Sequence, residues 1–498
     1  MNFSDINFIK LIKTFTKEEI FEFEKFVYSP YFNNQTALTR LYDEIIKYYP
    51  HFNKIDFTKE NLFSAVFPDK EYNDTLFRKY TSNLMKLAED FLVCKELSSN
   101  EDRKMTCLLD QYDKRQLTSF FEKQLKKAEK TISERGKINL ETFYYKHFRE
   151  ELKASYFTRI NKLHLIKSCI IKSHIYILLH MLLTNTVYTN MMLIIQKSFR
   201  DSDGDNDYFE KFNEVFDLIG YLEKVNDLED VEKMFISLCR IDVVIFNDPH
   251  NIDNIVIMKD IIFKMADMLS NNLLYTFFSH LNIYYLLNIS VKNDELNRDL
   301  FENYKFMIER GLYISEDREF INFSEYRTIL LYSLRLKEFD WAEKFISQYK
   351  NFHNPAEKEN IYIYSRVLLN FEKKDFEAAM QMISVLRIND MIMKMDTDII
   401  LLLIYFEMDY IDNALSLIDS FRHYMLENKI LSKDVIKNHI DFLKFYRFLL
   451  MNKNNIIKQE ESDKIKAEIM NHSNLRRKSW LLEKLEGING CKKQEIKY

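Results

Sequence analysis

The chain has 498 residues, of which 71 are basic and 76 acidic, so its formal net charge is -5. Its 6 glycines and 5 prolines compare with roughly 35 and 25 expected from average usage. Because β-hairpins and phosphate-binding loops depend on residues that adopt positive φ, this composition excludes a sheet-rich fold and glycine-rich nucleotide loops. We therefore expect an all-α protein, whose nearly neutral charge gives the whole molecule no attraction to polyanions.

Residues 1–95 carry the signals of a compact four-helix unit. Thr16 and Glu19 form a capping box, and the helix that follows should end at Ser29-Pro30. The apolar residues on its buried stripe are Ile20, Phe23, Phe26 and Val27. Thr58 is expected to cap a short helix, and the fourth helix should begin near Asp74.

Residues 96–200 are expected to form long helical hairpins, and residues 201–320 irregular helical repeats. No residue from 173 to 196 is formally charged, and this length would suffice to span a bilayer. Polar side chains interrupt the segment, however: His174, His180, Thr184, Asn185, Thr186, Thr189 and Asn190. We therefore predict a central helix, or a helix pair broken near Thr184-Asn185, in place of a membrane span.

The acidic run 200–207 predicts a surface loop. Its aspartates alternate as calcium ligands do in an EF-hand loop. The sixth place counted from Asp203 is Tyr208, however, where the sharp turn of such a loop needs glycine. A solvated acidic loop is the better interpretation.

An internal repeat lies in residues 321–425. Three segments of this region align with one another: 337–346, 374–383 and 409–418. The alanines that superimpose are Ala342, Ala379 and Ala414, spaced by 37 and 35 residues. Because a small residue lets a paired helix approach closely, the pattern predicts stacked helix pairs, with these segments as the second helices.

These segments resemble the tetratricopeptide repeat family, whose period is about 34 residues. The resemblance implies an α-α superhelix of antiparallel helix pairs, with residues 426–498 as capping helices. It also implies a concave face lined by the first helix of each pair. Over its whole length the chain further resembles an uncharacterised family of long helical proteins from Bacteroidota, through residues 29–33, 335–342 and 480–485.

A concave face of this kind suits a peptide or a helix of another protein. The resemblance assigns five residues of the first helices to it: Tyr326, Arg327, Tyr364, Arg366 and Asn370. Tyr326 and Tyr364 could instead be core residues. The expected function is that of a non-enzymatic helical-repeat scaffold that binds a partner protein or peptide.

The alternative function is nucleic-acid binding by the N-terminal unit. The helix from Asp74 follows a short helix and a turn, as in winged-helix regulators, whose second helix enters the major groove. Its basic residues Arg78, Lys79 and Lys86 would contact the nucleic acid, and the repeats would act as a sensor or dimerisation part. Because the residues after Cys94 predict more helix in place of a β-hairpin wing, we favour the scaffold.

The sequence has no pattern typical of a catalytic, cofactor-binding or metal-binding site. Its five cysteines are scattered without a C-x-x-C pair, and its 11 histidines contain no H-E-x-x-H. We therefore expect no enzyme activity, no cofactor and no metal. The N-terminus has no secretory signal, and the expected location is the cytoplasm, without membrane association.

Overall fold

The structure is a computed structural model. It describes residues 6–52, 55–135, 137–198, 211, 216–288, 294–314, 319–388, 390–453, 459–472 and 475–495. The chain is 78% helical, with 23 α-helices and no strand in the described ranges, which confirms the all-α prediction. The acidic run 200–207 lies outside these ranges.

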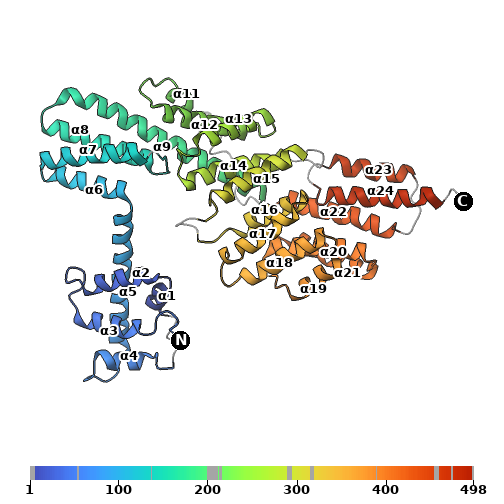
Figure 1. The fold of residues 1–498 in the computed structure, drawn as a ribbon, viewed down its shortest axis with the longest axis horizontal. Coiled ribbons are helices and arrows are strands. Elements are labelled where there is room, and N and C mark those ends of the chain that lie inside the picture. The colour runs from blue at the N-terminus through green and yellow to red at the C-terminus, as the bar shows by residue number, and fades with distance from the viewer. Residues whose placement is uncertain are drawn as a thin grey trace. The chain divides into compact units, whose positions relative to one another are not determined.

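The chain divides into two compact units, and Figure 1 shows the helices of both. The first unit is Met1–Glu134 with Phe148–Lys167, and the second is Arg135–His147 with Ser168–Tyr498. The helices of the first unit are α1 (Asn7–Ile12), α2 (Lys17–Tyr28), α3 (Thr36–Ile46), α4 (Lys59–Val66), α5 (Asp74–Ser99), α6 (Glu101–Lys114), α7 (Thr118–Arg135) and most of α8 (Thr142–Arg159).

Local signals set the helix ends of the first unit as predicted. Thr16 Oγ1 accepts from the Glu19 N–H at 3.1 Å, and Glu19 Oε2 accepts from the Thr16 N–H at 2.8 Å, which completes the capping box. Thr58 Oγ1 caps α4 by accepting from the Asn61 N–H at 3.2 Å. The helix from Asp74 is α5, which continues unbroken to Ser99.

Helices α1 to α5 enclose a hydrophobic core of their own. At its centre the Phe23 ring meets the rings of Tyr42 and Phe91, each with centroids 5.4 Å apart. The short helix α1 contributes Phe8, Ile9 and Ile12 to this core. The N-terminal segment therefore has five helices where the sequence predicted four.

The second unit is a succession of helices that share one hydrophobic core. They are α9 (Leu163–Ser198, from Ser168), α11 (Leu218–Leu222), α12 (Asp230–Asn247), α13 (Ile252–Met265), α14 (Asn271–Asn288), α15 (Asp294–Glu309), α16 (Phe323–Arg335), α17 (Phe339–Tyr349), the 3-10 helix η2 (Lys350–Phe352), α18 (Lys358–Glu372), α19 (Phe376–Val385), α20 (Met391–Glu407), α21 (Ile411–Glu427), α22 (Lys433–Met451), α23 (Gln459–Asn471) and α24 (Lys478–Glu495). Each helix from α12 to α22 packs on the next, and α18 also contacts α16 and α20.

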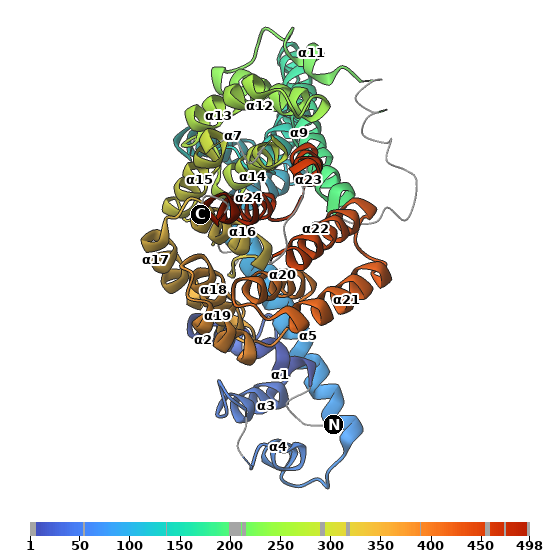
Figure 2. The same ribbon diagram turned by 90° about the vertical axis from the view of Figure 1, so that its right-hand side faces the viewer.

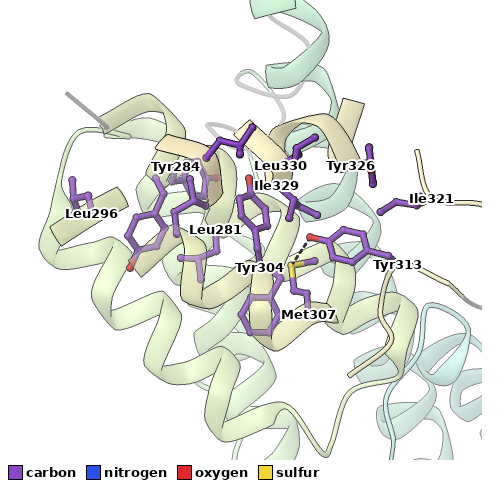
Figure 3. Close-up of a cluster of buried hydrophobic side chains, with 14 of the residues drawn as sticks. Leu281, Tyr284, Leu296, Tyr304, Met307, Tyr313, Ile321, Tyr326, Ile329 and Leu330 are labelled. Atoms are coloured by element: carbon purple, nitrogen blue, oxygen red, sulfur yellow. Dashed lines mark hydrogen bonds between the residues drawn. The ribbon is translucent and has the colours of Figure 1, made fainter. Parts of the chain in front are cut away.

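Aromatic side chains fill the core where α14, α15 and α16 meet (Figure 3). Tyr284, Tyr304 and Tyr326 come from these three helices in turn, and all are buried. Their neighbour Tyr313 donates its hydroxyl to Met307 Sδ at 3.3 Å. Aromatic residues make up 15% of the chain, and some of them therefore fill its core.

The uncharged segment 173–196 belongs to one continuous helix, α9, so the predicted alternative of a helix pair broken near Thr184-Asn185 is wrong. Its part Leu163–Thr189 is long and apolar enough to cross a membrane by length and composition. In its most apolar 18-residue window only 28% is buried. The helix thus keeps exposed apolar side chains: Leu163, Leu165, Ile170, Ile171, Met181 and Tyr188.

The helices α17, α19 and α21, which contain the three repeat alanines, follow turns of one kind. In each turn a residue other than glycine adopts the left-handed conformation: Lys337, Lys374 and Asp409, with φ of 61°, 64° and 62°. In each turn the next N–H also donates to the carbonyl five residues earlier at 2.9 Å: Glu338 to Ser333, Asp375 to Asn370 and Tyr410 to Tyr405. This is the Schellman end of a helix. All three alanines are fully buried.

Candidate functional site

The candidate site is a cavity of 880 Å³ in the second unit. Its wall comes from α14, α16, α18, α20 and α22, together with the start of α24. The lining residues are Leu286, Arg327, Thr328, Leu331, Tyr332, Arg335, Lys337, Leu368, Phe371, Glu372, Asp396, Ile399, Ile400, Val435, Asn438, His439, Leu475, Arg476, Arg477, Lys478, Ser479, Trp480 and Glu483. The volume lies in the range of small-molecule pockets, and the wall combines apolar and charged side chains as such pockets do.

A largely buried ion pair forms one part of the wall. Arg327 binds Asp396 with both Nε and Nη2, the latter at 2.6 Å from Oδ1. Tyr364 donates its hydroxyl to Asp396 Oδ2 at 2.6 Å. Burial alone would raise the pKa of Asp396, but the charge and the hydrogen bonds of Arg327 hold it below its ordinary value. Asp396 is therefore a carboxylate at neutral pH.

The start of α24 closes another side of the cavity. Arg477 Nη1 donates to Glu372 Oε1 of α18 at 2.8 Å, and Trp480 Nε1 donates to Glu407 Oε1 of α20 at 3.1 Å. The Trp480 ring also stacks on Tyr446 of α22, with centroids 6.1 Å apart. In Figures 1 and 2, α24 lies beside α22. These contacts fix the loop before α24 against three helices.

His439 lines the cavity and is almost completely buried. Its Nδ1 lies 2.7 Å from the carbonyl of Val435, which assigns the proton to Nδ1 and leaves Nε2 as an acceptor. Burial, with a smaller contribution from the positive charge of Arg476, lowers the pKa of His439 to about 4. The imidazole is therefore neutral at neutral pH.

Arg476 lines the same cavity, and its side chain is exposed to solvent. The partial loss of hydration lowers the pKa of its guanidinium, and the positive charge of Arg327 lowers it further. The neighbouring Arg477 is paired with Glu372, and Arg327 with Asp396. Among the described residues Arg476 makes no ion pair.

Of the five residues predicted to bind a partner, the structure brings Arg327 and Tyr364 into one network, and Arg327 alone lines the cavity. Tyr326 is a buried core residue, stacked on Phe345 with centroids 4.9 Å apart. Arg366 lies outside the cavity wall, with Nη1 3.7 Å from Glu343 Oε1. Asn370 is also buried, with Nδ2 3.6 Å from Met382 Sδ.

Sequence reasoning missed Asp396, His439, Arg476 and Trp480, because they come together only through contacts between distant segments. Arg477 and Glu372, for example, are separated by 105 residues. One signal was available: Asp396 stands near the start of an otherwise strongly apolar helix, where an unpaired carboxylate would be costly.

The basic residues of the alternative function lie on α5. Arg78, Lys79 and Lys86 are all exposed. The Arg78 Nε is 2.7 Å from Asp74 Oδ2 one turn earlier. This pair reduces the net positive charge of that face.

The described residues contain no cluster of three His, Cys, Asp or Glu side chains that could hold a metal ion. Burial raises the pKa of the Cys239 thiol well above its ordinary value, so this cysteine is not activated. No protein-family model, no curated protein and no solved structure matches this chain. The function must therefore be argued from the geometry.

Proposed function

We propose that the protein is a non-enzymatic helical-repeat scaffold whose second unit binds a segment of a partner protein or peptide. The observation that carries this proposal is the 880 Å³ cavity along α14, α16, α18, α20 and α22. These are the first helices of successive pairs, which line the concave face in an α-α superhelix.

Two further observations support a superhelix of antiparallel pairs. The turns before α17, α19 and α21 each have one residue in the left-handed conformation and the same hydrogen bond, as do the turns after α6, α8 and α15. In addition, α18 contacts the first helices on both sides, α16 and α20. Packing between successive first helices is what a stack of helix pairs requires, so it supports the proposal.

The experiment is affinity purification of the full chain from its source cells, followed by mass spectrometry, with a cavity variant and a matched control. Leu331→Trp places a bulky ring at the cavity wall, whereas Val385→Trp places it on an exposed site of α19 outside the wall. We expect the intact chain and the control to retain the same proteins, and the cavity variant to lose them. Equal recovery by all three chains would contradict binding in the cavity.

A further inference from the structure

In the cavity wall, cationic side chains outnumber carboxylates. Six are cationic: Arg327, Arg335, Lys337, Arg476, Arg477 and Lys478. Three are carboxylates: Asp396, Glu372 and Glu483. Asp396 forms an ion pair with Arg327, and Glu372 forms one with Arg477. Glu483 Oε1 lies 3.4 Å from Lys484 Nζ. The wall therefore has a surplus of positive charge.

The surplus of positive charge is most marked around Arg476. It stands next to Arg477 in the chain and close enough to Arg327 for the two positive charges to repel each other. Asp396, the carboxylate that acts on it, is already bound by Arg327. Like charges close together raise the energy of the folded state, and an anion bound between them would lower it.

The position of Arg476 is fixed by its neighbours. Leu475 before it is buried, and Arg477 after it is held by Glu372 and lies over the Phe371 ring, 5.4 Å from its centroid. The backbone at Arg476 is therefore anchored on both sides, and its guanidinium carries a planar fork of N–H donors, which suits a carboxylate or a phosphate group.

We propose that this cavity binds a small organic oxyanion, with Arg476 as the main ligand of its carboxylate or phosphate group. The apolar part of the wall, which includes Leu331, Leu368 and Ile399, would contact the body of the ligand. Arg335 and Lys337, which also make no ion pair among the described residues, add to the positive potential. The inference requires the cavity alone and does not depend on a protein partner.

The fluorescence of Trp480 offers a direct measurement, because this ring lines the cavity and the chain has only one other tryptophan, Trp341. In a Trp341→Phe background, the probes are benzoate and phenyl phosphate, with benzyl alcohol and phenol as neutral analogues of the same body. We expect saturable changes in emission with one or both anions at constant ionic strength, and at least tenfold weaker binding of the neutral analogues.

The Arg476→Gln variant should weaken anion binding at least tenfold, because a charge-assisted hydrogen bond is lost. Arg476→Lys keeps the charge and should retain part of the affinity. The matched control is Arg422→Gln, which removes an exposed arginine of α21 that does not line the cavity. Circular dichroism confirms that each variant is folded, and if Arg476→Gln is not, Arg335→Gln takes its place with an expected loss of at least threefold.

Equal binding by the Arg476→Gln variant and the parent would overturn the inference, as would equal affinity for an anion and its neutral analogue. Binding of an acidic peptide without any binding of the small anions would also overturn it, and would instead support the scaffold. If the Leu331→Trp variant loses its partner proteins while the parent chain binds no small anion, the scaffold proposal is supported and the anion proposal fails.

Discussion

His353 is a buried imidazole whose two ring nitrogens both lack a hydrogen-bond partner in the described structure. Tyr326 meets its ring edge-on, with centroids 4.5 Å apart. Burial lowers the pKa of His353 to about 4, and the pKa of an unfolded histidine is about 6.5. Between these two values the unfolded chain binds the proton and the folded chain does not, so folding loses free energy as the pH falls.

Replacing His353 by leucine should flatten this pH dependence. In the parent chain we expect His353 to contribute a loss of about 3 kcal/mol in the free energy of unfolding as the pH falls from 6.5 to 4. In His353→Leu the loss of stability due to His353 should disappear. The loss due to His439, whose pKa is also lowered, should remain. Urea unfolding at pH 7.5, 5.5 and 4.5 measures it, with the exposed His423→Gln as control. Parallel stability curves for His353→Leu and the parent would disprove the argument.

The turns before α17, α19 and α21 each contain one residue in the left-handed conformation. These residues provide a second test at the scale of single residues. Lys374 has a φ of 64°, a conformation that costs a residue with a Cβ about 1 to 2 kcal/mol. Lys374→Gly relieves this strain but gives the unfolded chain more freedom, so we expect a net gain of about 0.5 to 1 kcal/mol. Glu377→Gly, at an exposed site inside α19, should instead lose about 1 kcal/mol. A lower melting temperature for Lys374→Gly than for the parent would refute this explanation.

At the scale of the elements, the three aligned alanines are buried in the second helices of the pairs. Ala379 in α19 is fully buried, as are Ala342 and Ala414 at the equivalent places. In Ala379→Asp a larger side chain and an unpaired carboxylate would be buried, so we expect a loss of about 3 kcal/mol or more. Thermal unfolding of the full chain measures it, and the exposed Gln381→Asp of the same helix is the control. An unchanged melting temperature for Ala379→Asp would show that α19 does not pack through this residue.

The elements also show what could be predicted from the sequence. Thr16, Thr58 and the three alanines act within a helix or between helices adjacent in the chain, so their patterns were sufficient. The exposure of much of α9 was not predictable, because an apolar sequence does not say which of its side chains neighbouring helices cover. The cavity was missed for a related reason, since its wall combines α16 with α24.

At the scale of the whole molecule, the two functions predict different responses to nucleic acid. A chain with a net charge of -5 has no field that attracts duplex DNA, so we expect only weak, non-specific binding even at about 50 mM salt. Gel shifts of the full chain and of a variant with Arg78, Lys79 and Lys86 replaced by alanine should be equally weak. A sequence-dependent shift that is lost in the triple variant would establish the alternative function for the N-terminal unit.

The docking of α24 also bears on how the second unit unfolds. In a stack where each helix pair touches only its neighbours, unfolding can begin at one end and proceed pair by pair. Here Arg477 joins α24 to α18, Trp480 joins it to α20, and the Trp480 ring joins it to α22. Because one helix bridges three others, loss of any of them removes support from the rest. We therefore expect α18, α20, α22 and α24 to unfold together.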